Sequence, residues 1–294
     1  MNVKINNIGV VGNGFVGGAV QKTLQHFYDV CTYDTKKELS SCENLEELVS
    51  KSRFIFVCLP TPMRNTGQCD ITRVKNTILK INRICGTELY KNRIVIIKST
   101  VVPGTTDTLN EQCENISVLF NPEFLTEANS FNDFKNQSRI IIGGSRPASS
   151  YTKTMFRKVF PLIPIIKTGA KYAEVVKYFI NCFLTTKISF ANEMYELCEA
   201  INLDYDKVVE YALYDNRLGQ SHFSVPGPDG DFGFGGHCFP KDLLAMIYFR
   251  GALGLSSTML DATRRKNFEV RSNLDWEKMK GRAVTDEEEG DIEE

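Results

Sequence analysis

Short apolar runs alternate with amphipathic segments through the first 170 residues. The apolar runs have the length of buried strands, and the segments between them carry apolar residues at helical spacing. This alternation is typical of a parallel sheet with helices packed on it. The sequence therefore predicts an α/β, Rossmann-like, doubly wound domain. Its expected strands are residues 8–11, 30–33, 53–59, 93–98, 116–120, 139–144 and 162–166, and two of its helices are 44–51 and 71–82.

The pattern changes after Gly169. Residues 171–200 contain no Gly or Pro and keep helical periodicity, which predicts a helix of roughly 45 Å at about 1.5 Å per residue. The end of the chain, TDEEEGDIEE, holds seven acidic residues and no periodic apolar positions, so we expect it to be disordered. Shorter helices are expected at 205–213, 240–250 and 258–272. The expected division is a sheet domain at 1–168, a small helical domain at 169–275 and a disordered acidic tail at 276–294.

Three glycines follow the first expected strand and precede a helical segment. Gly12, Gly14 and Gly17 form GxGxxG, which lets the backbone turn tightly and approach a pyrophosphate at the helix N-terminus. Asp34 ends the next strand, where a carboxylate holds a ribose 2′-hydroxyl and repels a 2′-phosphate. This context predicts NAD rather than NADP. The alternative is a glycine-rich turn that binds no ligand.

The stretch GFGGHCFPKD, residues 233–242, has the features of a nucleophile site. Pro240 is suited to the first turn of a helix, so Cys238 is expected just before a helix N-terminus. There the helix dipole and the nearby Lys241 favour thiolate over thiol. The alternative is a buried structural cysteine, the more frequent fate of this residue type.

Polar residues also follow the strands. Thr61, Thr100 and Glu123 come just after expected strands, and ligands on such sheets bind beyond the carboxyl ends. Lys177 and Asn181 are four residues apart on the long helix, and therefore on one face of it. Their ammonium and amide could stabilise negative charge on a substrate oxygen. The alternative is a solvated lysine beside an asparagine without a special role.

Composition narrows the class of protein. A formal net charge of −1 gives no reason to expect nucleic acid. There is no apolar run of about 18 residues and no signal-peptide layout, so we expect a cytoplasmic protein that does not enter a membrane. Three histidines and the absence of CxxC pairs predict no metal site, and the nine cysteines are expected to be thiols. Without the last ten residues, 35 basic and 29 acidic side chains remain, an excess of +6 that suits an anionic substrate.

The motifs, taken together, resemble the UDP-glucose/GDP-mannose dehydrogenase family. They are GNGFVG, LPTP, KSTVVPGTT, NPEFLTEA, KYFIN, DNRLG and GFGGHCFPKD, in the family's order over about residues 5 to 250. The FPKD ending is most similar to that of UDP-glucose 6-dehydrogenases. The resemblance implies an NAD-dependent, two-step, four-electron oxidation of a nucleotide sugar, with UDP-glucose to UDP-glucuronate as the first expectation.

The resemblance also implies roles for individual residues and a homodimer through residues 171–200, in which Arg217 reaches the neighbouring subunit's substrate. Cys238 would be the nucleophile, Lys177 and Asn181 the pair that stabilises an oxyanion, and Glu127 a general base. The implied catalytic residues are Cys238, Lys177, Asn181, Asp242, Thr100, Glu127 and Glu123. The implied NAD contacts are Gly12, Gly14, Phe15, Val16, Gly17, Asp34, Thr61, Thr100, Glu127 and Lys241. The implied substrate contacts are Glu123, Phe124, Leu125, Lys177, Asn181, Arg217, Phe234 and Gly235.

The chain departs from the family's pattern in four places. It is expected to lack the C-terminal domain that closes over the nucleotide, and its loop before Cys238 is longer than usual. His237 and Ala128 stand where many members have other residues. These departures leave GDP-mannose or a UDP-N-acetyl amino sugar as alternative substrates, and a non-catalytic relative that binds NAD or a nucleotide sugar as an alternative function. A β-hydroxyacid or 6-phosphogluconate type dehydrogenase shares the expected plan, but it uses lysine chemistry without a nucleophilic cysteine.

Overall fold

The computed structural model describes residues 7–87, 90, 92–126 and 129–286. The chain divides into two compact units. The first contains the chain up to Thr61 together with Ile71–Lys177, and the second contains Pro62–Asp70 together with the chain from Tyr178 onward. Among the described residues, no helix is both long and apolar enough to span a membrane.

The first unit is built on a seven-stranded sheet with the order β2-β1-β3-β4-β5-β6-β7. Neighbouring strands pair in parallel except for β5 and β6, which meet antiparallel at Phe120 and Gly143. The predicted doubly wound α/β fold is confirmed, with two strands at one edge reversed. The strands are β1 (Ile8–Val11), β2 (Val30–Tyr33), β3 (Phe54–Val57), β4 (Arg93–Ile97), β5 (Ile116–Phe120), β6 (Ile140–Gly143) and β7 (Ile165–Thr168).

Strand β7 begins later than the predicted residue 162. Leu162 is exposed, and the strand starts directly after Pro164. Because proline has no N–H to give to a sheet ladder, it commonly stands at the edge of a strand rather than within it.

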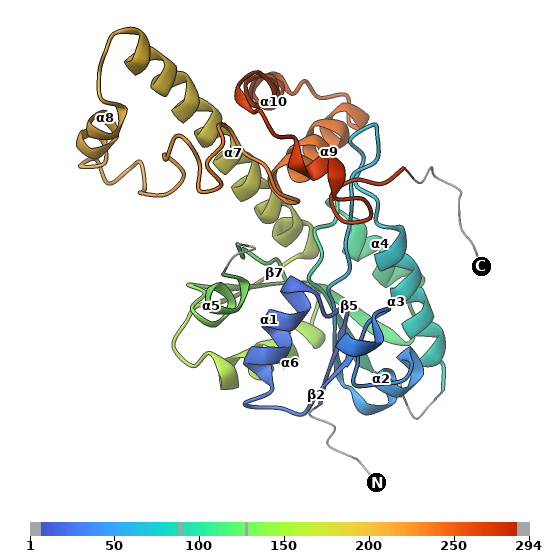
Figure 1. The fold of residues 1–294 in the computed structure, drawn as a ribbon. Helices are drawn as coiled ribbons and strands as arrows, with labels where there is room; N and C mark the ends of the chain where they lie inside the picture. Colours follow the sequence, from blue (N-terminus) through green and yellow to red (C-terminus); the bar gives the residue numbers. More distant parts are fainter. Residues whose placement is uncertain (1–6, 88–89, 91, 127–128, 287–294) are drawn as a thin grey trace. The chain divides into compact units, whose positions relative to one another are not determined.

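Helices cover both faces of this sheet. Alternate residues of one strand belong to different apolar clusters, as with Phe54 and Phe56 on one face and Ile55 and Val57 on the other. Helices α2, α3 and α4 contribute to the Ile55 cluster, while α1, α5 and α6 contribute to the Phe54 cluster (Figure 1). Their bounds are α1 (Phe15–Leu24), α2 (Leu45–Lys51), α3 (Thr72–Ile84), α4 (Thr105–Gln112), α5 (Ser130–Lys135) and α6 (Ala148–Val159).

The long helix was predicted correctly, and it is α7 (Ala170–Ala200). Its first two turns belong to the first unit. The buried Glu174 carboxylate accepts hydrogen bonds from the backbone N–H groups of Gly104 (2.6 Å) and Thr106 (2.9 Å) and from the Thr106 hydroxyl (2.6 Å). Ala173 packs in the Ile55 cluster. These contacts place the unit boundary after Lys177, inside the helix, rather than at the predicted residue 168.

In the described part of the chain, the second unit contains the rest of α7, three shorter α-helices, α8 (Tyr205–Ala212), α9 (Phe239–Ala252) and α10 (Thr258–Val270), and the 3-10 helix η2 (Asp275–Lys278). Residues 62–70 lie against its C-terminal segment. The Met63 N–H donates to the Ala283 carbonyl (2.8 Å), and the Thr285 N–H donates to the Met63 carbonyl (2.9 Å). Met63, Trp276 and Ala283 form one buried cluster.

Residues 276–286, which we predicted to belong to a disordered tail, are therefore folded. The acidic composition of the last ten residues hid the apolar anchors before them, Trp276 and Ala283. Pairing with Met63 also provides hydrogen-bond partners for backbone groups of the segment. No local sequence pattern reveals this pairing. Residues 287–294 lie outside the described part of the chain.

Candidate active site

The glycine-rich turn between β1 and α1 is shaped by close backbone approaches. Gly12 has a φ of +84°, and a Cβ there would lie 2.7 Å from the Cys58 carbonyl oxygen. A Cβ on Gly17 would lie 1.9 Å from the Gly12 carbonyl oxygen. Gly14, at the N-cap of α1, would meet nothing within 4 Å. Packing thus requires glycine at positions 12 and 17, while Gly14 borders open space at the helix N-terminus.

Asp34 stands beside this turn. Its Oδ2 accepts from the Asn13 N–H (2.7 Å), and its Oδ1 accepts from the Lys36 N–H (2.9 Å). No side chain caps α1 at Gly14, and the next two residues, Phe15 and Val16, open the helix. A helix N-terminus facing open space, next to a carboxylate at the end of β2, fits a pyrophosphate and a ribose diol. The residues present therefore fit NAD.

The ends of β3 and β4 are joined by a side-chain hydrogen bond. The Thr61 hydroxyl donates to the Thr100 carbonyl (2.8 Å), and both residues are buried. Ser99 forms a second link, since its hydroxyl donates to the Leu59 carbonyl (2.6 Å). The structure thus brings together the two threonines that the motifs LPTP and KST singled out.

A buried ion pair follows β5. Lys177 Nζ donates to both Glu123 Oε1 (2.8 Å) and the Glu123 carbonyl (2.8 Å), and the other carboxylate oxygen accepts from the Leu125 N–H (2.8 Å). Burial would raise the pKa of Glu123, but the Lys177 ammonium and these hydrogen bonds outweigh it and lower the pKa. Lys177 is 3% exposed, so the alternative of a solvated lysine is wrong.

A second buried lysine supports the same turn. Lys98 Nζ donates to Asn121 Oδ1 (3.0 Å) and to the Pro122 carbonyl (3.4 Å). Burial lowers the pKa of Lys98 to about 8. The sequence places Lys98 at the end of the apolar run RIVIIK and in the motif KSTVVPGTT, but sequence reasoning assigned it no role. A cavity of about 130 Å³ adjoins this turn. It is lined by Lys98, Glu123, Phe124, Leu125, Asp133, Phe134, Gln137, Ser138 and Arg139.

In the second unit, Cys238 is the N-cap of α9, as predicted, with Pro240 in the first turn. The Asp242 carboxylate, which is 0% exposed, accepts from Lys241 Nζ (2.5 Å) and from Asn181 Nδ2 (2.6 Å). Burial would lower the pKa of Lys241, but the Asp242 carboxylate outweighs it, and Cys69 and Cys238 act in the same direction, so the pKa is raised. Lys241 therefore stays an ammonium, and it lies three residues after Cys238 at the start of the same helix, where a nearby cation favours a thiolate.

Lys177 and Asn181, predicted as a pair, have different partners. Lys177 pairs with Glu123 in the first unit, and Asn181 bonds to Asp242 in the second. Sequence reasoning identified all four residues but not these pairings.

The other predicted site residues have varied surroundings. Arg217 is exposed, and its Nε donates to Asp215 Oδ1 (2.9 Å). The Phe234 ring is buried against Cys182 and Leu243, and Gly235 follows it in the glycine-rich loop. Glu127 lies outside the described residues. Within the described ranges, no group of three or more His, Cys, Asp or Glu side chains is arranged to hold a metal ion.

The Glu123 pair makes stability depend on pH in a specific way. Because the pKa of Glu123 is lowered in the fold, its pairing stabilises the protein above the ordinary glutamate range and is lost as the pH falls through that range and below. Glu123→Gln removes the carboxylate partner of a buried ammonium, so we expect it to cost about 3 kcal/mol at pH 7. Urea unfolding should show this difference shrinking at pH 3.5, where wild-type Glu123 is more protonated.

The exposed Glu114 supplies the matched control. Glu114→Gln should change the free energy of unfolding by less than about 0.5 kcal/mol at either pH. A Glu123→Gln difference that stays the same from pH 7 to 3.5 would rule out the buried carboxylate as its source.

Two domains of one family match the chain. Residues 29–161 match the NAD binding domain of the UDP-glucose/GDP-mannose dehydrogenase family, and residues 171–269 match the family's central domain. The first match confirms NAD as the cofactor of this family domain, in agreement with the glycine turn and Asp34.

Similar proteins carry related names. The UDP-glucose 6-dehydrogenase TuaD of Bacillus subtilis is 30% identical over 245 residues, which are 81% of this chain and 51% of the relative. A UDP-glucose 6-dehydrogenase of Rickettsia bellii is 31% identical over 304 residues, and the match covers 90% of this chain and 67% of the relative. The solved structure of a UDP-glucose dehydrogenase from Pyrobaculum islandicum has a TM-score of 0.80 at 30% identity, and the match covers 90% of this chain and 68% of that chain. The chain thus spans from about half to just over two thirds of the length of these three relatives, and it belongs to the UDP-glucose/GDP-mannose dehydrogenase family.

Proposed function

We propose that this protein oxidises the primary alcohol of a nucleotide sugar to a carboxylate, with UDP-glucose as the first expected substrate. The observation that carries the proposal is Cys238 at the N-terminus of α9, with Lys241 and the buried Asp242 in the next turn. A thiol in this setting is favoured as a nucleophile. Family membership and the NAD binding domain support the reaction class.

The first unit would hold the cofactor. Gly12 and Gly17 permit the tight turn, and Gly14 leaves room for a pyrophosphate at the start of α1. Asp34 would accept from the ribose hydroxyls. Phe15 and Val16 would contribute the first turn of the helix, and Thr61, Thr100, Glu127 and Lys241 are the further proposed contacts. When bound, NAD supplies a hydride acceptor, used once for the alcohol and once for the thiohemiacetal.

Cys238 would make and break the covalent bond. After the alcohol has become an aldehyde, the thiolate attacks the aldehyde carbon, and the new C–S bond gives a thiohemiacetal. Oxidation of this species leaves a thioester, and water then adds to the carbonyl carbon, so that the C–S bond breaks and the thiolate returns. Overall, one alcohol, two NAD⁺ and one water give one carboxylate, two NADH and three protons. The covalent bond divides a difficult oxidation into easier steps.

Charged and amide groups would stabilise the oxygen during these steps. Lys177 and Asn181 each carry N–H donors that could bind the developing oxyanion. Asp242 with Thr100 would position the attacking water, Glu127 would act as the general base, and Glu123 would keep Lys177 charged. Phe124 and Leu125 line the cavity in the first unit and are proposed to contact the substrate, together with Phe234 and Gly235.

Turnover of wild type and Cys238→Ala tests this proposal. The wild-type protein should form two NADH per UDP-glucose consumed, and Cys238→Ala should lower kcat by roughly 10³-fold because the covalent route is lost. Cys31→Ala, which changes a half-buried thiol in the sheet unit, is the matched control and should keep its rate. The measurement is NADH absorbance together with product quantification.

Other outcomes would redirect the proposal. Steady turnover by Cys238→Ala would remove the covalent mechanism. NADH formation with GDP-mannose or a UDP-N-acetyl amino sugar, but not with UDP-glucose, would change the substrate. NAD binding without turnover on any of these sugars would favour the non-catalytic alternative.

We also propose that two copies pair through α7. In the second unit this helix exposes four large apolar side chains at intervals of four or seven residues, which places them along one face. They are Phe179, Phe183, Phe190 and Leu197, and Ile201 is exposed directly after the helix ends. Arg217, also exposed, is the residue proposed to reach the neighbouring subunit's substrate.

Light scattering after gel filtration tests the pairing. Wild type should have the mass of a dimer, and Phe183→Asp should be monomeric because it places a charge in an apolar contact. Leu253→Asp, at an exposed apolar position after α9, should remain dimeric. A monomeric wild type, or a dimeric Phe183→Asp variant, would contradict pairing through this face.

A further inference from the structure

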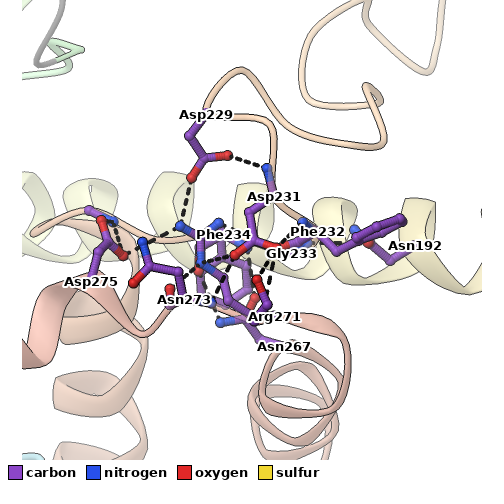
Figure 2. Close-up of polar contacts among 12 residues, drawn as sticks. Asn192, Asp229, Asp231, Phe232, Gly233, Phe234, Asn267, Arg271, Asn273 and Asp275 are labelled. Carbon is purple, nitrogen blue, oxygen red and sulfur yellow. Dashed lines mark hydrogen bonds and ion pairs between the residues drawn. The ribbon is translucent and has the colours of Figure 1, made fainter.

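The glycine-rich loop before Cys238 is held by side chains from other elements (Figure 2). The Phe234 N–H donates to Asn267 Oδ1 (2.7 Å), and Asn267 Nδ2 donates back to the Phe234 carbonyl (3.0 Å). The Gly233 N–H donates to Asn192 Oδ1 (3.2 Å), and the Gly236 N–H donates to Asp275 Oδ2 (3.0 Å). The backbone of this loop is thus bound by residues of α7, of α10 and of the 3-10 helix that follows α10. We call Asn192, Asn267, Arg271 and Asp275 the loop clamp.

Arg271 is the central cation of the clamp. Its side chain is 1% exposed, and its Nη2 donates to Asp229 Oδ2 (2.6 Å). The same guanidinium donates to the Asn273 carbonyl (2.9 Å) and the Phe232 carbonyl (3.3 Å). Asp231 and Asp275 also lie within ion-pair distance. A planar guanidinium with five N–H groups can bind several acceptors in fixed directions, which a lysine ammonium cannot.

The glycines of the motif leave room for the clamp. A Cβ on Gly235 would lie 2.2 Å from Arg271 Nη2 and 2.4 Å from Asp275 Oδ1. A Cβ on Gly233, whose φ is +65°, would lie 2.2 Å from Asn267 Oδ1. The clamp therefore explains two of the glycines in GFGGHCFPKD without reference to a ligand.

Cys238 lies between two anchors. On its C-terminal side, its carbonyl accepts from the Asp242 N–H (3.0 Å), which begins α9. On its N-terminal side, only His237 separates it from Gly236, which Asp275 holds. Because both flanking segments are fixed, few backbone angles remain that could move Cys238 relative to Lys241, which lies three residues later.

We propose that Asn267 and Arg271 are positioning residues that hold the loop so that the Cys238 thiol stays beside the Lys241 ammonium. The chemical use of that thiol rests on the proposed function, whereas its placement does not. Neither residue touches the reacting atoms in this account. They act through the backbone of residues 232–236.

Alkylation of Cys238 by iodoacetamide tests the placement without turnover. The rate is followed by mass spectrometry of the Cys238 peptide from pH 5 to 10, in wild type and in Asn267→Ala. In the variant, the rate at pH 7 relative to its plateau at high pH should fall about tenfold, because the thiolate spends less time beside the ammonium. A change in access to the thiol would alter the rate at pH 7 and the plateau rate by the same factor, so it cancels in this ratio.

A second pair of variants distinguishes the effect of the guanidinium's directed hydrogen bonds from the effect of its positive charge. Arg271→Lys keeps a cation among the three carboxylates and should shift the Cys238 profile in the same direction. Arg264→Lys makes the same substitution at an exposed position of α10 and should leave the profile unchanged. Cys182, buried in the same unit, reports on opening of the fold and should stay protected in all variants.

The outcomes separate the two proposals. An unchanged Cys238 profile in Asn267→Ala and Arg271→Lys, with Cys182 protected, overturns the positioning role whatever the enzyme oxidises. Rapid alkylation of Cys182 in both variants also overturns it, since the clamp would then only maintain the fold. A shifted Cys238 profile in a protein that oxidises no nucleotide sugar would support the positioning role and refute the proposed function.

Discussion

The fully buried Asp242 carboxylate is the group on which the second unit's chemistry depends. A charge without solvent is costly unless it is paired and hydrogen-bonded, and here Lys241 and Asn181 fill both roles. The requirement fixes α9 against α7, and it keeps an ammonium at the helix start where Cys238 stands. The first unit contains a similar arrangement in Glu123 and Lys177. Replacing such pairs with apolar groups is often neutral or favourable for stability, so their presence points to chemistry.

The glycines of the two motifs meet different physical demands. Gly12 and Gly17 permit close backbone approach within the turn, and Gly14 leaves the start of α1 open. In the loop before Cys238, by contrast, side chains of the clamp occupy the space that a Cβ on Gly233 or Gly235 would need. A glycine-rich motif can therefore mark either room for a ligand or room for the protein's own polar side chains.

Periodicity alone was enough to predict the sheet and the long helix, because each strand and each turn of α7 repeats a local pattern of burial. The types of residue at the strand ends, and Cys238 at a helix N-terminus, were likewise readable from short motifs. Pairings over long separations were not. Lys177 meets Glu123 54 residues away, and Asn267 meets Phe234 33 residues away, with no motif around Asn267 to suggest it. The folding of residues 276–286 escaped prediction for the same reason, since its partner is Met63.

The central claim is that Cys238 forms a covalent bond to the sugar carbon during oxidation. Acid quenching of the wild-type protein with NAD⁺ and UDP-glucose, followed by mass spectrometry of the digested chain, tests it most directly. The account predicts a thioester-linked nucleotide sugar on the peptide that contains Cys238 during turnover. NADH formation with that peptide unmodified at every time sampled would contradict it.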